Sequence, residues 1–247
     1  MPHLKSIEKN VLVDTLGHDK GDGGSRTKRV FHLKNRLAAL PSVFLTVYVP
    51  TIALLCGVVL LRVFANVPIG ELMRDPVNLL KFPFYLGLVS NIGILFWCSA
   101  AAICLFTSVV MRKHPVEHRF SQFLFVSGII TIFLLLDDFF NLHDVVYPEY
   151  LHIHEYLVYA IYGTVVALYL VTFRATILQT ENALIFLLAL GFFGLSLLTD
   201  MLTDRNLVLI PAQFLVEDGL KLFGIMSWFA FFSKESARHL KLVMISR

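Results

Sequence analysis

Charged side chains are scarce in this sequence. Only 16% of its 247 residues are Asp, Glu, Lys or Arg, whereas 57% are hydrophobic and the mean hydropathy is +0.72. Soluble globular proteins average roughly 25% charged residues. The composition therefore excludes an ordinary soluble domain and indicates an integral membrane protein.

Cysteine is rare, and the motifs of several enzyme classes are absent. The three cysteines, Cys56, Cys98 and Cys104, all lie in apolar stretches and predict no disulfide framework. The chain has no Walker motif, no Gly-rich dinucleotide loop, no Cys-x-x-Cys and no His-Glu-x-x-His. ATP hydrolysis and conventional metalloprotease chemistry are therefore poor candidates, and we expect no nucleic-acid partner.

Long apolar runs make up most of the chain. Each is close to the roughly 20 residues that a helix needs to cross the hydrocarbon core of a bilayer. We predict an all-α, polytopic membrane protein with six transmembrane helices in a bundle, over residues 42–64, 84–111, 120–142, 149–173, 183–203 and 211–233. Pro148 and Pro211 suit the first turns of the fourth and sixth spans.

The segments on either side of residues 42–233 are basic. Residues 1–41 start polar, without a cleavable secretory signal, and we expect them to be partly disordered. A group of cations directly before the first span predicts contact with anionic lipid headgroups. These cations are Arg26, Lys28, Arg29, Lys34 and Arg36. Residues 234–247 form a second basic tail.

Lysine and arginine are divided unevenly between the two sides of the predicted membrane. With six spans both termini share a side, and sixteen of the 21 basic residues fall on it. The loop between the third and fourth spans contains neither lysine nor arginine. Because cytoplasmic loops carry the excess of positive charge, we predict cytoplasmic termini in a plasma, inner or equivalent membrane.

Acidic and histidine side chains gather at the opposite, extracytoplasmic ends of spans three to six. They are Asp137, Asp138, His143, Asp144, His152, His154, Glu155, Asp200, Asp204, Glu217 and Asp218, with the amide of Asn141 among them. A charge left in lipid costs roughly 2.5 to 3.5 kcal/mol even on a lenient scale. The deeper carboxylates therefore indicate a functional site, while the outer residues are equally typical of solvated helix ends.

Four helices that each contribute carboxylates or imidazoles at one level are typical of a metal site inside a bundle. Oxygen and nitrogen ligands without thiolate favour a divalent zinc, iron, manganese or copper ion. The candidate ligands are Asp137, His143, His152, His154, Glu155, Asp200 and Glu217. Asp138, Asp218 and Lys221 are then the candidate catalytic residues, with a spare carboxylate as general acid or base.

Lys221 lies roughly 15 Å along the sixth span, near mid-membrane. A lysine at that depth requires an acidic partner. The expected partner is Glu217, Asp218 or Asp200.

Two tyrosines extend the cluster inward. Tyr159 and Tyr162 share a face of the fourth span with His152 and Glu155. Their hydroxyls are expected either to bond the carboxylates or simply to pack between helices.

A weak internal repeat links the last four spans. Asp137 and Asp200, and likewise Gly128 and Gly191, are separated by the same 63 positions. This offset predicts that spans three and four and spans five and six are duplicated helical hairpins.

The favoured functional hypothesis is a metal-binding membrane enzyme that acts on a lipid or other hydrophobic substrate. The sequence does not decide whether the chain is an enzyme. One alternative is a cation- or proton-coupled transporter, and another is a non-catalytic subunit or assembly factor of a membrane complex.

Overall fold

The computed structural model describes residues 45, 48–74, 76–112, 118–204 and 213–245. The regular secondary structure in those ranges is helical and contains no β-strand, which confirms the predicted all-α class. The chain divides into two compact units, residues 1–83 and 84–247, which are described separately.

The first unit contains α3 (Val49–Phe64) and two short helices, α4 (Ile69–Met73) and α5 (Pro76–Leu80). Helix α3 has 16 residues, and none of its side chains is buried. The predicted N-terminal basic segment, residues 1–41, lies outside the described residues.

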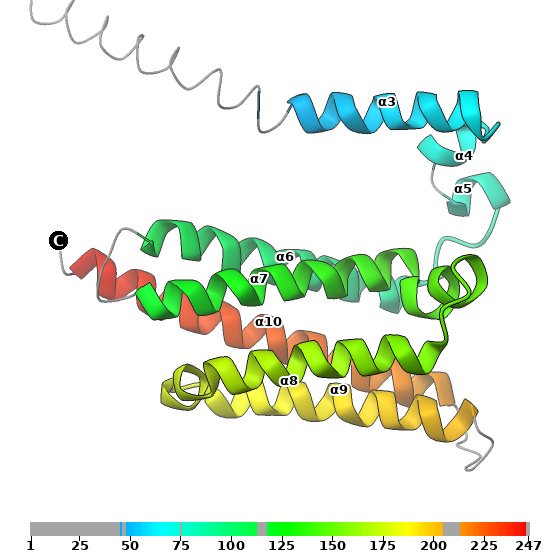
Figure 1. Ribbon diagram of the computed structural model, residues 1–247. Coiled ribbons are helices and arrows are strands. Elements are labelled where there is room, and N and C mark those ends of the chain that lie inside the picture. Colours follow the sequence, from blue (N-terminus) through cyan, green and yellow to red (C-terminus); the bar gives the residue numbers. More distant parts are fainter. Residues whose placement is uncertain (1–44, 46–47, 75, 113–117, 205–212, 246–247) are drawn as a thin grey trace, which may run out of the picture. The chain divides into compact units, whose positions relative to one another are not determined.

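The second unit is a helical bundle (Figure 1). Its elements are α6 (Leu88–Met111), α7 (His118–Phe140), the π-helix η3 (Leu142–Tyr150), α8 (Glu155–Gln179), α9 (Ala183–Asp204) and α10 (Gln213–Ile245). Helix α6 packs along α7 and α10, and α10 packs along α9. Helix α8 approaches α7 and α9 over only a few residues, so part of its inner face is left open to a cavity.

An aromatic core and small polar residues hold these helices together. Phe123, Phe186 and Phe231 are fully buried where α7, α9 and α10 meet. Between α6 and α7, the hydroxyl of Ser108 donates to the carbonyl of Ser121 at 2.8 Å, and the hydroxyl of Ser121 returns a bond to the carbonyl of Ser108 at 2.9 Å. Small residues of this kind let helix backbones approach closely in a membrane.

Four of the described helices are long and apolar enough to cross a membrane. They are α6, α7, residues 157–179 of α8 and residues 183–203 of α9. The prediction of six spans is thus confirmed only in part. Helix α3 is shorter, and α10 carries Glu217, Asp218 and Lys221 in its first third.

Two predicted helix boundaries are wrong. The fourth helix begins at Glu155 rather than near residue 149, because the chain first forms η3 with Pro148 inside it. The last helix does not end at residue 233 but continues to Ile245. Lysine, glutamate, alanine and leucine in this extension are all good helix formers.

The duplicated hairpin is not confirmed. Helix α9 packs closely along α10, whereas α7 and α8 meet over a few residues and are separated in sequence by η3. The two pairs of helices therefore differ in packing.

Candidate binding pocket

A cavity of about 440 Å³ lies among α6, α7, α8, α9 and α10, and we refer to it as the inter-helix pocket. Its polar lining includes Asp137, Asp138, His143, Tyr159, Tyr162, Ser196, Asp200, Glu217 and Lys221. Its apolar lining includes Trp97, Ile130, Leu134, Val166, Leu170, Leu190, Phe193, Leu197 and Trp228. The polar residues occur at the late ends of α7 and α9 and the early ends of α8 and α10, so one end of the pocket is polar and its body is apolar.

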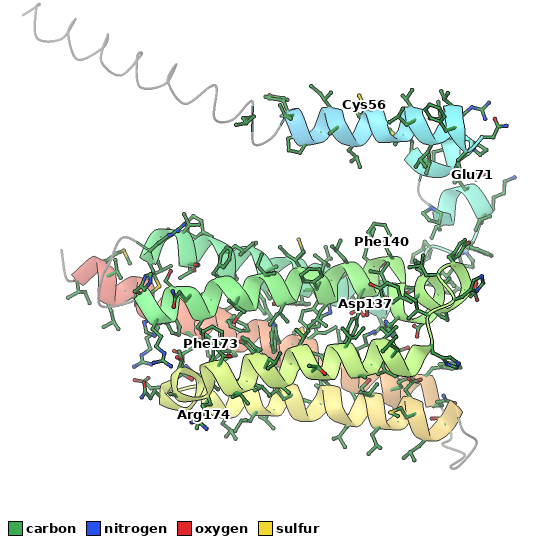
Figure 2. All side chains as sticks on the ribbon, in the orientation of Figure 1. Cys56, Glu71, Asp137, Phe140, Phe173 and Arg174 are labelled. Carbon is green, nitrogen blue, oxygen red and sulfur yellow. The ribbon has the colours of Figure 1, made fainter. Side chains whose placement is uncertain are left out.

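Asp137 and His143 form the tightest contact at the polar end. Asp137 lies in the last turn of α7 and is 5% exposed. Figure 2 shows it on the side of α7 that faces α8, whereas Phe140 points away from α8. Asn141 adopts a left-handed conformation (φ 47°), which asparagine tolerates better than most residues. The chain reverses there, and Nδ1 of His143 comes to 2.6 Å from Oδ2 of Asp137.

The second ring nitrogen of His143 also meets a carboxylate. Nε2 lies 3.1 Å from Oδ1 of Asp144, whose side chain is 58% exposed. Only the imidazolium form has a proton on both nitrogens and can donate to both carboxylates. Burial lowers the pKa of His143, but the hydrogen bond to Asp137 and the charges of Asp137 and Asp144 outweigh burial and the charge of Lys221. The net result is a raised pKa.

Asp138 connects three helices. Its Oδ1 atom lies 2.7 Å from Nζ of Lys221 on α10, and its Oδ2 atom accepts a hydrogen bond from Nε1 of Trp97 on α6 at 2.8 Å. Lys221 therefore has an acidic partner, as predicted, but the prediction of Glu217, Asp218 or Asp200 as that partner is wrong. Glu217 and Asp218 are close to Lys221 in sequence, and Asp200 was expected at a similar depth in the membrane. Helix packing instead brings Asp138 of α7 to the lysine.

The two tyrosines of α8 bond the carboxylates. The hydroxyl of Tyr162 donates to Oδ1 of Asp137 at 2.8 Å, and that of Tyr159 donates to Oδ2 of Asp200 at 3.2 Å. This is the first of the two roles expected from the sequence. The α8 tyrosines thus attach this helix to α7 and α9 at the polar end of the pocket.

The remaining candidate residues are more dispersed. Asp200 and Glu217 line the pocket, and Ser196 donates a hydrogen bond to the backbone carbonyl of Glu217 at 3.0 Å. His152 and His154 are exposed before the start of α8 and are not part of the pocket lining. The side chain of Glu155 lies outside the described part of the structure.

The predicted zinc, iron, manganese or copper site is not supported. Within the described ranges, no group of three or more His, Cys, Asp or Glu side chains is placed to hold a metal ion. His143, the one candidate histidine that lines the pocket, has both ring nitrogens directed at carboxylates.

Comparison with known proteins identifies a family but assigns no activity. Residues 43–234 match a family described as a domain of unknown function (DUF8692). The chain belongs to this family. No curated protein and no solved structure gives a significant match. The residues that line the inter-helix pocket all fall within the part of the chain that matches DUF8692.

A smaller cavity of about 40 Å³ adjoins the polar end. Asp138 and Lys221 line both this cavity and the inter-helix pocket, so their ion pair stands between the two spaces. Asp218, a predicted catalytic residue, lines the smaller cavity together with Ser90 of α6. A volume of this size has room for water.

Sequence reasoning missed the aromatic wall of the pocket. Trp97 and Trp228 are the only tryptophans in the chain, and both line the pocket. Phe193 stacks on Trp97 with ring centroids 5.5 Å apart. The rarity of tryptophan was the available signal, but both tryptophans lie in apolar runs in which a lipid-facing ring is equally common.

Proposed function

We propose that this chain is an integral membrane protein of six spans, with both termini on the cytoplasmic side, that binds a largely apolar molecule with a polar head. In this proposal α3 and α10 supply the two spans beyond the four that are long and apolar enough by themselves. The uneven distribution of lysine and arginine supports the orientation.

The proposal rests mainly on the inter-helix pocket, which is polar at one end and apolar along the rest of its lining. Its volume of about 440 Å³ lies in the range of roughly 300 to 1,000 Å³ that is usual for small-molecule sites. Such sites are mainly apolar, with a few polar groups that orient the ligand. Here the aspartates, Lys221 and the tyrosine hydroxyls would hold a head group, and the aromatic and aliphatic wall would hold a chain or ring.

The position of α8 supports entry from the surrounding lipid. Its outer face is exposed and apolar, with Leu157, Ile161, Val165 and Leu168 following helical spacing. On the inner side, a Cβ atom added at Gly163 would meet no other heavy atom within 4 Å. The wall between lipid and pocket is therefore a single helix with space behind it.

The two tryptophans allow a direct test. We expect 11-bromoundecylamine, a long-chain amine with a contact quencher, to quench the tryptophan fluorescence of the purified protein in a saturable manner. Gly194 lines the pocket, and a Cβ there would meet nothing within 4 Å, so Gly194→Leu is designed to place a side chain in the pocket. This variant is expected to lose the saturable quenching.

Gly191→Leu is the matched control. It lies on the same helix and has equally open surroundings, but it is not part of the pocket lining. We expect it to keep the quenching of the wild type. Equal quenching in both leucine variants, or quenching that rises linearly with the amount of amine in the lipid, would show that the probe reaches the tryptophans without entering the pocket.

A further inference from the structure

We propose that Asp144, His143 and Asp137 form a proton relay between the protein surface and the inter-helix pocket, and that the molecule bound there has a head group that accepts a proton. The proposal rests on the binding function proposed above. It adds a route for protons and a chemical class for the ligand.

The relay is a continuous series of contacts. Oδ1 of Asp144 lies 3.1 Å from Nε2 of His143, and Nδ1 of the same ring lies 2.6 Å from Oδ2 of Asp137. The other carboxylate oxygen of Asp137 accepts the hydroxyl of Tyr162 at 2.8 Å. Every neighbouring pair lies within the range over which a proton can be transferred through a hydrogen bond.

The two ends of the series lie in different environments. The side chain of Asp144 is 58% exposed, whereas that of Asp137 is 7% exposed. Asp137, His143 and Tyr162 line the pocket, but Asp144 does not. A proton that enters at Asp144 therefore reaches the pocket after passing one imidazole ring.

Histidine suits the middle position because it accepts a proton on one nitrogen and releases another proton from the second. The backbone N–H of His143 also donates to Asp137 Oδ1 at 3.2 Å, which fixes the residue against the carboxylate. The titratable groups around the ring come from four elements. They are Asp137 of α7, Asp144 of η3, Tyr159 of α8 and Lys221 of α10.

The transfer conserves protons and moves no electrons between molecules. Asp144 takes a proton from hydronium at the surface and passes it to Nε2 of the neutral His143 ring, while the proton on Nδ1 moves to Asp137. Asp137 then gives its proton to the lone pair of the ligand head. The net change is one proton from hydronium to the ligand. The ring returns to its first tautomer when water protonates Nδ1 and removes the proton from Nε2, a step with no net transfer.

The charges of the pocket favour a basic head group. Four carboxylates, those of Asp137, Asp138, Asp200 and Glu217, line it together with one lysine, Lys221, and the imidazole of His143. An anionic head would meet this excess of negative charge, whereas a protonated amine would be stabilised by it. The chemical class indicated is thus a lipophilic weak base that enters neutral from the lipid and is protonated in the pocket.

Neutral red provides a probe of that class, because it is a lipophilic weak base whose absorption spectrum changes on protonation. The full chain would be placed in phosphatidylcholine nanodiscs with the dye bound, and the dye would be followed after a rapid drop in pH. Binding is measured separately by saturable quenching of Trp97 and Trp228, and Gly194→Leu defines the signal from outside the pocket.

We expect His143→Gln to slow protonation of the pocket-bound dye on the order of a hundredfold, the low end of what a positioned proton donor contributes. Asp144→Asn should slow it by about tenfold, since water replaces part of the role of an exposed carboxylate. Asp144→Asn should bind the dye as the wild type does, since Asp144 is not part of the pocket lining. For His143→Gln, the rate is measured only on dye that the quenching shows to be bound. The matched control is Glu149→Gln, which removes another exposed carboxylate from η3 and should leave the rate unchanged.

The possible results separate the two proposals. Wild-type protein without saturable quenching would overturn the binding function itself. Normal binding with equal protonation rates in the wild type, Asp144→Asn and His143→Gln would overturn the relay alone. An equal slowing by Glu149→Gln and Asp144→Asn would also overturn it, because the effect would then come from surface charge. Asp144 is exposed, so its replacement tests the relay even if His143→Gln fails to fold.

Discussion

The two ends of the α6–α10 bundle hold their carboxylates in different ways. At the end opposite the pocket, Glu235 of α10 is fully buried. Its Oε1 atom accepts bonds from the backbone N–H and the side-chain amide of Asn182 at 3.2 and 2.7 Å. Its Oε2 atom lies 3.5 Å from a guanidinium nitrogen of Arg238. At the polar end, Asp137 and Asp138 are also bonded, but they border a cavity.

The difference distinguishes a structural carboxylate from one available to a ligand. Glu235 joins α10 to the residues just before α9, so its bonds serve helix packing. Asp137 and Asp138 join helices too, yet each still borders a space in which another molecule can lie. Equal loss of charge at the two ends should therefore change different properties.

The largest effect on stability is expected at the end of the bundle opposite the pocket, where Glu235 lies. Glu235→Ala leaves the amides of Asn182 and the guanidinium of Arg238 without their buried acceptor, so the free energy of unfolding should fall by about 3 kcal/mol. Unfolding in detergent, followed by circular dichroism, measures this. Glu181 contacts the same arginine at 2.9 Å but is 72% exposed, so Glu181→Ala should cost less than about 1 kcal/mol. Similar losses in both variants would contradict a special role for Glu235.

The next effect concerns the ion pair at the pocket. Asp138→Asn leaves Lys221 without a charged partner and should cost about 2 kcal/mol, less than a fully buried pair because the lysine side chain is 38% exposed. Adding Lys221→Met should recover part of this loss, since the unpaired charge is then gone. A double-mutant cycle of unfolding free energies tests the coupling, and strictly additive losses would show that the two side chains do not interact.

A smaller effect is expected from the apolar side of the pocket. A Cβ atom at Gly224 would lie 2.5 Å from Cε1 of Phe193, so Gly224→Ala should displace this ring and cost about 1 to 2 kcal/mol. Because Phe193 stacks on Trp97, the emission spectrum of the tryptophans should change as well. Gly219→Ala, where a Cβ meets nothing within 4 Å, should change neither property. An unchanged spectrum in Gly224→Ala would argue against this contact.

The smallest effect is a pH dependence that only the polar end should show. The pKa of His143 is raised above its usual 6.5, so its stabilising contribution is complete below that value and is lost as the pH rises through the folded-state pKa. Thermal unfolding midpoints should therefore fall as the pH rises above about 6.5, and more steeply in the wild type than in His143→Gln. His118→Gln, which changes an exposed histidine at the start of α7, should keep the wild-type slope. Equal slopes in all three proteins would contradict the assignment.

The helices that are apolar throughout were the most predictable part of the fold. The described bounds of α6, α7 and α9 lie within a few residues of the predicted spans, because long apolar runs have few alternatives in a membrane. The start of α8 was missed because a π-helix between residues 142 and 150 has no distinct sequence pattern. The end of α10 was missed because charge marks the edge of the membrane rather than the end of a helix.

The sequence could predict which kinds of residue gather at the candidate site, but not which side chains contact each other there. Asp137, Tyr162 and Lys221, which helical spacing assigns to one cluster, all line the inter-helix pocket. The contact between Lys221 and Asp138 depends on how α7 packs against α10, which spacing within a helix does not reveal. Glu235 was missed for a related reason, since a glutamate between Lys234 and Arg238 is typical of a solvated surface.

Three tyrosine hydroxyls link α8 to its neighbours. Tyr159 bonds Asp200, Tyr162 bonds Asp137, and the hydroxyl of Tyr169 lies 2.7 Å from that of Ser127. Interhelical bonds of this kind average about 0.6 kcal/mol in a membrane, so the three together contribute about 2 kcal/mol. Two of them end on carboxylates that line the pocket. A ligand head that bonds those carboxylates could take the place of the tyrosines, so entry would exchange hydrogen-bond partners rather than lose them.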